Sequence, residues 1–127
     1  MGAVHSRRPP HAMEHTIQAS CVRWFRYAYP SSIIFAIPNG GARDKVTGAR
    51  LKEEGVLAGI PDLMIAEPSG IWHGMFVEMK NGKVGVVSDA QKERMAGLTE
   101  AGYLCVVCRD FPEFEKAVSA YMSGRGR

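Results

Sequence analysis

Two apolar segments decide the fold predicted for this chain: GIPDLMIA at residues 59–66 and GMFVEMK at residues 74–80. Each contains a short run of mostly hydrophobic residues bounded by glycine, proline or charged residues, which is typical of a β-strand. The turn Pro68-Ser69-Gly70 makes the connection between them tight, and a tight connection favours antiparallel pairing. The sequence therefore predicts a β-hairpin near the middle of the chain.

Helix and strand patterns alternate on both sides of this hairpin. Hydrophobic residues at helical spacing predict helices, and short continuous apolar runs predict strands. We expect helices at about 13–28, 44–54, 89–101 and 111–122, and strands at 33–37, 63–66, 74–80 and 103–108. The order α-β-α-β-β-α-β-α predicts an α/β domain with a small mixed β-sheet flanked by helices. We expect this domain at residues 12–123, between a disordered leader at 1–11 and a disordered tail at 124–127.

The composition fits one globular domain and excludes several other classes of protein. The chain has 127 residues, of which 46% are hydrophobic, so a disordered chain is excluded. No apolar run is long enough to span a bilayer and no secretion signal is visible, so we expect no membrane partner. The net charge of +3 comes from four arginines near the ends. Without them, 12 basic groups face 13 acidic groups, which argues against a basic surface over the whole molecule.

The three cysteines, Cys21, Cys105 and Cys108, favour a reducing compartment rather than a disulfide-bonded fold. Cys105 and Cys108 have the spacing of a metal-binding pair. However, they lie in an apolar run, and the sequence contains no second pair that would complete a zinc site. We therefore expect buried, unreactive thiols.

Charged residues of the hairpin form the candidate catalytic group. Glu78 and Lys80 project to the same side of their strand, and antiparallel pairing brings Glu78 close to Asp62 at the start of the other strand. Two adjacent carboxylates repel each other unless a cation such as Mg²⁺ neutralises them. The backbone carbonyl of Met79 is a further candidate oxygen ligand. The simpler interpretation is a Glu78–Lys80 salt bridge, with Asp62 capping the strand entry.

The wider sequence context favours the metal site. Pro61-Asp62 followed by Glu78-Met79-Lys80 resembles the PD-(D/E)xK nuclease signature. Over roughly residues 13–110, further motifs occur in the order seen in the VRR-NUC family: Glu14 and Gln18, Pro38-Asn39-Gly40-Gly41, Gly59 to Leu63, Phe76 to Lys80, and Ser88 with Gln91. The resemblance implies a restriction-endonuclease-like core.

The resemblance also implies a role for each residue of the site. It implies that Asp62 and Glu78 are the main metal ligands and that Lys80 is the catalytic lysine. It also implies that Glu14 is a first-helix acid that contacts the metal directly or through water, and that Gln91 is the helix residue that completes the site. Glu14 could instead pair with the helix dipole, and Gln91 could form a capping box with Ser88. The role of Gln18, one helical turn from Glu14, stays open.

A loop and a helix carry the basic residues that could contact DNA. In the loop Asn39-Gly40-Gly41-Ala42-Arg43, glycine lets backbone N–H groups approach a phosphate, and Arg43 can bind the phosphate with two hydrogen bonds. Asn39 could instead only stabilise the turn. Further candidates for phosphate contact are Lys45, Arg50 and Lys52. Arg23 and Arg26 belong to the same basic cluster, although a solvated helix face also explains such charges.

We expect a metal-dependent, structure-selective DNA endonuclease that uses Mg²⁺ and accepts Mn²⁺ in its place. The resemblance implies a free-standing viral or bacterial VRR-NUC protein, cytoplasmic in a bacterium or an infected cell, that cuts four-way (Holliday) junctions as a homodimer. Symmetrical incision needs two active sites related by a two-fold axis. Two alternatives remain: a nuclease directed to flaps, nicks or ends with the same site, and a non-catalytic DNA-binding module.

Overall fold

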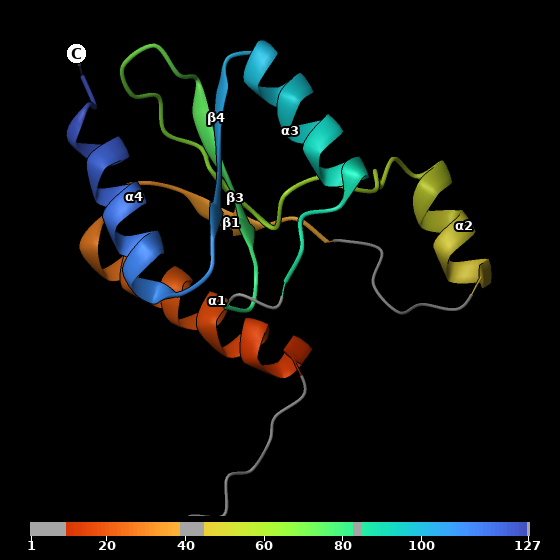
Figure 1. The fold of residues 1–127 in the computed structure, drawn as a ribbon. Helices are drawn as coiled ribbons and strands as arrows, with labels where there is room; N and C mark the ends of the chain where they lie inside the picture. The colour runs from red at the N-terminus through yellow and green to blue at the C-terminus, as the bar shows by residue number, and fades with distance from the viewer. Residues whose placement is uncertain (1–9, 39–44, 83–84, 127) are drawn as a thin grey trace, which may run out of the picture.

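The computed structural model describes residues 10–38, 45–82 and 85–126, and its elements follow the predicted order (Figure 1). The helices are α1 (Pro10–Ala28), α2 (Lys45–Glu53), α3 (Asp89–Glu100) and α4 (Phe111–Ser123). The strands are β1 (Ile34–Ala36), β2 (Leu63–Ile65), β3 (Gly74–Met79) and β4 (Tyr103–Cys108). The predicted α/β class with a mixed sheet and flanking helices is confirmed.

The strands form one sheet in the order β1-β2-β3-β4. β1, β2 and β3 pair antiparallel in turn, whereas β4 lies parallel to β3 after the crossover through α3. The predicted hairpin is confirmed by the pairing of Leu63 with Val77. Asp62 precedes Leu63 and therefore lies beside the end of β3, where its Oδ2 accepts a 2.8 Å hydrogen bond from the Met79 N–H.

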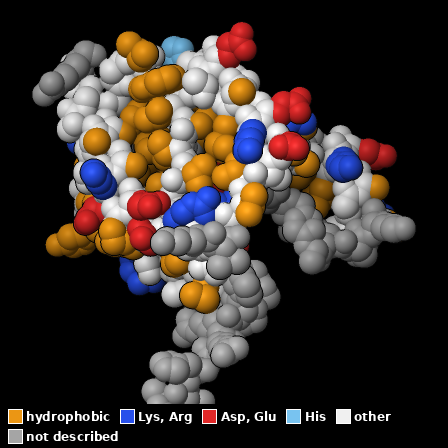
Figure 2. Space-filling view, in the orientation of Figure 1, with side chains coloured by type: hydrophobic (Ala, Val, Ile, Leu, Met, Phe, Trp, Pro, Cys, Tyr) orange, Lys and Arg blue, Asp and Glu red, His pale blue; other side chains and the backbone are white. Residues whose placement is uncertain are grey.

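Both faces of β3 are covered, because all of its residues are buried. Met75, Val77 and Met79 belong to the core that also contains side chains of α1 and α4. Phe76 and Glu78 alternate onto the opposite face, where α3 packs beside β4 (Figure 1). In the space-filling view, hydrophobic side chains gather over the central strands on the face between α3 and α4 (Figure 2). Glu78 is therefore a carboxylate placed on a buried strand.

Some element boundaries differ from the prediction. α1 begins at Pro10, before the expected Met13, because proline is tolerated in the first turn of a helix, where its missing N–H is not needed. β1 and β2 are shorter than expected. Their pairing nevertheless continues beyond the strands, since the Ile37 N–H donates to the Asp62 carbonyl and the Ala66 N–H donates to the Ile33 carbonyl.

The two ends of the chain differ in what the structure describes. Most of the predicted leader lies outside the described residues. In the predicted tail, the Gly124 carbonyl accepts a 3.2 Å hydrogen bond from the Gly70 N–H, and the Arg125 guanidinium lies 5.2 Å from the centre of the Tyr29 ring. Within the described part of the chain, no helix combines the length and the hydrophobicity needed to cross a membrane.

The cysteine environments agree with the expected unreactive thiols. Cys21 and Cys108 are buried in the core, and burial raises the pKa of each thiol to about 12. Burial also raises the pKa of the half-buried Cys105. All three are free thiols, and a raised pKa keeps them in the less nucleophilic protonated form at neutral pH.

Candidate active site

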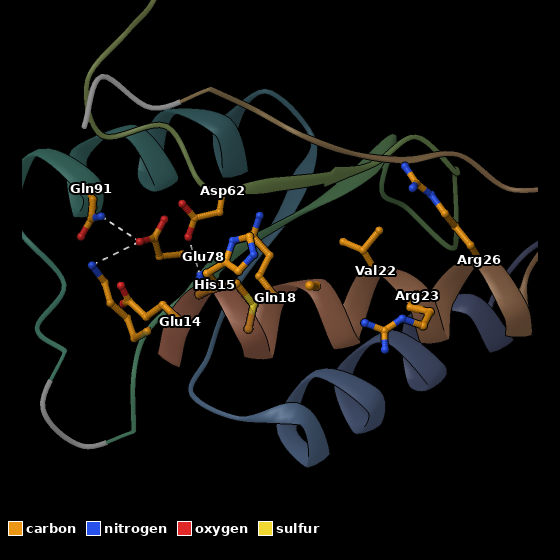
Figure 3. Close-up of a pocket in the computed structure, with 12 residues that line it drawn as sticks. Glu14, His15, Gln18, Val22, Arg23, Arg26, Asp62, Glu78 and Gln91 are labelled. Atoms are coloured by element: carbon orange, nitrogen blue, oxygen red, sulfur yellow. Dashed lines mark hydrogen bonds and ion pairs between the residues drawn. The ribbon is translucent and has the colours of Figure 1, made fainter. Parts of the chain in front are cut away.

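The residues predicted to form the catalytic site line one cleft of about 830 Å³ (Figure 3). They come from three parts of the chain: Glu14 and Gln18 from α1, Asp62, Glu78 and Lys80 from the hairpin, and Gln91 from α3. Met79, whose backbone carbonyl is a predicted ligand, lines the same cleft. The tertiary structure thus brings together residues that are far apart in the sequence.

Glu78 is the central residue of this cleft and is only 2% exposed. Its Oε2 accepts a 2.8 Å hydrogen bond from the Gln91 side-chain amide and lies 3.2 Å from the Lys80 Nζ. Its Oε1 is buried and, among the described residues, has no hydrogen-bond partner. Buried polar atoms are almost always paired, so this oxygen is the feature of the site that most needs an explanation.

The acidity of Glu78 reflects the same surroundings. Burial raises its pKa from 4.5 to about 7, the negative charge of Asp62 adds to the rise, and Lys80 opposes it. A hydrogen bond between the two carboxyl groups raises the pKa further. Such a bond requires a proton on one of the two groups. Burial and mutual repulsion therefore disfavour the state in which both carboxyl groups are ionised.

The salt bridge and the strand cap that offered a simpler interpretation are both present. Lys80 pairs with Glu78 at 3.2 Å, and Asp62 accepts the Met79 N–H. Neither contact pairs Glu78 Oε1. The simpler interpretation therefore accounts for part of the geometry and leaves the second Glu78 oxygen unexplained.

Gln91 forms the predicted capping box and also reaches into the cleft. Its N–H donates to the Ser88 Oγ at 3.1 Å, and its Oε1 accepts from the Ser88 N–H at 2.9 Å, which completes the capping box of α3. The remaining side-chain donor, Nε2, reaches Glu78. The cap fixes the amide so that only its NH₂ group faces the cleft, and the two interpretations are therefore compatible.

Glu14 does not lie where the helix-dipole interpretation would place it. Because α1 begins at Pro10, its first turn contains no acidic residue, and dipole effects are largest in that turn. Glu14 instead lines the cleft together with Gln18, one turn further along the helix (Figure 3). Both side chains therefore line the cleft and lie beyond the first turn of α1.

The donor groups of the cleft fit a hard divalent cation. Glu78 offers an unpaired carboxylate oxygen, Asp62 offers a second carboxylate nearby, and Mg²⁺ prefers such oxygen ligands. Across residues 10–38, 45–82 and 85–126, no three His, Cys, Asp or Glu side chains converge into a complete ligand cluster. Mg²⁺ usually keeps several waters and is bound through only one or two carboxylates, so a pair of acids suffices.

The predicted DNA-binding residues lie either outside the described residues or outside the lining of the cleft. Asn39, Gly40, Gly41 and Arg43 fall outside the described residues, as does the side chain of Lys45. Arg50 and Lys52 lie in the last turn of α2 and are not among the residues that line the cleft. In Figure 1, α2 extends to one side of the sheet.

Two other arginines of the predicted basic cluster line the cleft instead. Arg23 and Arg26 lie at its far end on α1, and the Arg26 Nη2 donates a 3.2 Å hydrogen bond to the Ile34 carbonyl. In Figure 3, Val22 and Arg26 point toward the same side of α1. The four-residue spacing of Gln18, Val22 and Arg26 could have indicated this shared face.

Comparison with known proteins shows similarity to VRR-NUC domain proteins over most of the chain. The model of the VRR-NUC domain family matches residues 11–111. A solved structure named "VRR_NUC domain protein" superposes with a TM-score of 0.75 and 26% sequence identity, over 89% of this chain and 90% of that chain. Another, named "VRR_NUC domain", has the same fold, with a TM-score of 0.59 and 18% identity, over 86% and 97% of the two chains. No curated protein matches.

The region matched by the family model includes the whole sheet and the candidate catalytic group. It begins on α1, before Glu14, and ends just after β4. The order and spacing of the motifs, the hairpin that joins Asp62 to Glu78, and the likeness to the two solved structures agree with one another. The chain belongs to the VRR-NUC domain family of the PD-(D/E)xK nuclease superfamily and has a nuclease-type fold.

Proposed function

We propose that this chain is a Mg²⁺-dependent endonuclease that hydrolyses phosphodiester bonds in branched DNA and works as a homodimer. The observation that carries the proposal is the carboxylate of Glu78, whose Oε1 is buried and unpaired beside Asp62 and Lys80. Leaving a charged, buried oxygen unpaired is costly. A bound divalent cation would pair this oxygen and relieve the repulsion between the two acids.

The residues of the cleft have distinct tasks in hydrolysis. Asp62 and Glu78 would hold the ion, with the Met79 carbonyl and Glu14, the latter through water, as further oxygen contacts. When bound, Mg²⁺ polarises a phosphoryl oxygen and increases the acidity of a bound water. Lys80 is held 3.2 Å from Glu78, where its ammonium group can orient the attacking water and stabilise the negative charge that develops on the phosphate. Gln91 fixes the Glu78 carboxylate.

The far end of the cleft supports a path for the DNA backbone. Along α1, the eight residue steps from Gln18 to Arg26 correspond to a rise of about 12 Å. This distance is comparable to the rise of three or four base pairs along the axis of a B-form duplex, about 3.4 Å each. A backbone phosphate at Arg26 or Arg23 would thus lie a few nucleotides from the bond that is cut. In this arrangement, the two arginines position the strand while the acidic end carries out the chemistry.

Branched DNA is proposed as the substrate because of the resemblance to free-standing VRR-NUC proteins. Resolution of a four-way junction requires two symmetrical cuts, and the sequence contains a single Asp62–Glu78–Lys80 group. Two copies related by a two-fold axis would supply both active sites. Mn²⁺ should substitute for Mg²⁺, since both ions accept carboxylate and water oxygens.

The decisive experiment compares a labelled four-way junction with a 5′ flap, a nicked duplex, a linear duplex and a single strand. Each substrate is incubated with Mg²⁺, with Mn²⁺ or with EDTA. We expect paired, symmetrical cuts in the junction with either metal and no cuts with EDTA. Glu78→Ala and Lys80→Ala should each lower the cleavage rate by about 100-fold or more and leave DNA binding largely intact. Lys116→Ala, at an exposed position on α4, is the matched control for Lys80→Ala.

Each other outcome has a definite meaning. Cleavage that persists in both variants would show that the active site is elsewhere. Cuts confined to flaps, nicks or ends would replace the junction with another substrate for the same site. DNA binding by the wild-type protein without cleavage under any metal condition would favour a non-catalytic binding module.

A further inference from the structure

We propose that Arg109 is a positioning residue that holds the catalytic lysine in place through the loop after β3. This inference rests on the proposed nuclease function, because it concerns the placement of Lys80. Arg109 follows β4 directly and is half-buried. It is not among the residues that line the cleft, so any effect on catalysis would be transmitted through other residues.

The side chain of Arg109 bonds to the loop at two points. Its Nη1 donates hydrogen bonds to the carbonyls of Gly82, at 2.7 Å, and Gly85, at 2.6 Å. In return, the Gly82 N–H donates to the Arg109 carbonyl at 3.2 Å. A single guanidinium nitrogen thus joins the two described ends of this short loop and fixes their separation. Bonds from a charged donor are stronger than those between neutral groups.

The two hydrogen bonds from Arg109 Nη1 to Gly82 and Gly85 are called the clamp below. The backbone of Arg109 is itself held by hydrogen bonds, so the position of the clamp is fixed. The Arg109 N–H donates a 2.8 Å hydrogen bond to the Glu113 Oε1 in the first turn of α4. The preceding carbonyl, that of Cys108, accepts a 3.0 Å hydrogen bond from the Lys80 N–H. The arginine therefore connects the start of α4, the end of β4 and the segment that leaves β3.

Gly85 transmits this constraint to the lysine side chain. A Cβ atom added at Gly85 would lie 3.0 Å from Lys80 Cβ and 3.1 Å from Lys80 Cδ, so the glycine backbone is packed against the lysine stem. The Gly85 N–H also donates to the Asn81 carbonyl at 3.2 Å. This packing limits the positions of a long side chain that is only 14% exposed and whose Nζ lies 3.2 Å from Glu78.

Such packing matters because lysine is flexible. A free lysine side chain has many accessible rotamers, and a misplacement of about 1 Å in an active site can lower the rate by about 100-fold. Loss of the Arg109 side chain should therefore reduce the turnover rate and leave the affinity for DNA unchanged. A side chain that contributes only to folding stability would produce no such separation.

The first experiment measures the clamp without any nuclease assay. In the metal-free and DNA-free protein, Arg109→Ala should increase the hydrogen-exchange rates of the Gly82 and Gly85 amides by about tenfold or more. Arg125→Ala is the matched control, because Arg125 also donates to a backbone carbonyl, that of Met122, but at the other end of the molecule. Exchange rates at both glycines that stay at the wild-type value would overturn the clamp.

The second experiment tests positioning. Under single-turnover conditions with saturating DNA and Mg²⁺, Arg109→Ala should cleave about 10- to 100-fold more slowly, with a Kd for DNA within about twofold of wild type. Gly85→Ala keeps the Arg109 side chain but pushes on the lysine stem, so it should show the same separation of rate from affinity. Guanidinium chloride at low, non-denaturing concentration should partly restore Arg109→Ala, and sodium chloride at equal concentration should not.

The two experiments distinguish failure of this inference from failure of the proposed function. Wild-type cleavage rates in both variants, despite faster amide exchange in Arg109→Ala, would overturn the positioning role while the nuclease function stands. A wild-type protein that cleaves no DNA would overturn the proposed function and the positioning role with it, and amide exchange would still report on the clamp.

Discussion

Replacing Glu78 by glutamine should abolish cleavage and, at the same time, stabilise the metal-free protein. The buried carboxylate has a pKa raised from 4.5 to about 7, because of burial and then the charge of Asp62. A tenfold change in acidity corresponds to about 1.4 kcal/mol, so ionised Glu78 lowers the free energy of unfolding by about 3 kcal/mol. A neutral glutamine avoids this loss and can still accept the hydrogen bond from Gln91.

The pH dependence follows from the direction of this shift. Since the folded-state pKa is the higher one, the wild-type protein has its full stability below about pH 4.5 and loses about 3 kcal/mol as the pH rises through 7. The stability advantage of Glu78→Gln should therefore be largest at pH 8 and fall below about 1 kcal/mol at pH 5. At pH 8, it should appear as a rise in Tm of roughly 10 °C.

Thermal and urea unfolding in EDTA at pH 5 and pH 8 provide the measurement. Glu115→Gln, at an exposed position on α4, removes a carboxylate of the same kind and should change the free energy of unfolding by no more than about 0.5 kcal/mol. Added Mg²⁺ should raise the Tm of the wild-type protein but not that of Glu78→Gln, because only a protein that binds the ion gains stability from it. A glutamine variant less stable than wild type at pH 8, or equally different at both pH values, would refute the reasoning.

Three further predictions test other parts of the site. Ser88→Ala should cost about 1 kcal/mol of stability through loss of the helix cap and leave the cleavage rate near wild type. Gln91→Ala should lower both the stability and the cleavage rate. Equal cleavage rates in the two variants would argue against a role for the Gln91 amide. Exchanging Arg23 and Arg26 for alanine in a Glu78→Ala background should weaken the salt dependence of DNA binding. The slope of the logarithm of the DNA-binding constant against the logarithm of the salt concentration should fall by about 1 per arginine. An unchanged slope would exclude phosphate contact at these two arginines. Gly59→Ala should destabilise the fold by about 1–3 kcal/mol in urea unfolding, because Gly59 has φ +85° and an added Cβ would lie 2.8 Å from a backbone oxygen of α3; stability equal to wild type would show that α3 can move aside.

The pairing of Asp62 with Glu78 could be predicted from the sequence because it depends on local rules. A tight connection between two apolar segments gives an antiparallel hairpin, and alternation along a strand then decides which side chains share a face. The observed pairing of Leu63 with Val77 follows this pattern. The capping box of Ser88 and Gln91 was predictable for the same reason, since its two residues lie within one turn of helix.

The exact beginning of α1 could not be obtained in this way, and it changed the interpretation of Glu14. Propensity and spacing locate a helix but leave its ends uncertain by several residues. With Pro10 as the first residue of α1, Glu14 lies beyond the first turn and faces the cleft. A small change in a helix boundary thus separated a local electrostatic role from a role in the site.

The sequence alone determined the class of the fold, the order of its elements and the identity of the acidic pair, because these depend on periodicity and short-range pairing. Tertiary structure alone decided that the Gln91 amide reaches Glu78 and that Arg109 bonds to the loop beside Lys80. Each of these contacts joins segments that are distant in sequence. They depend on how helices pack against the sheet and on which rotamers that packing allows, and no local pattern in the chain encodes those distances.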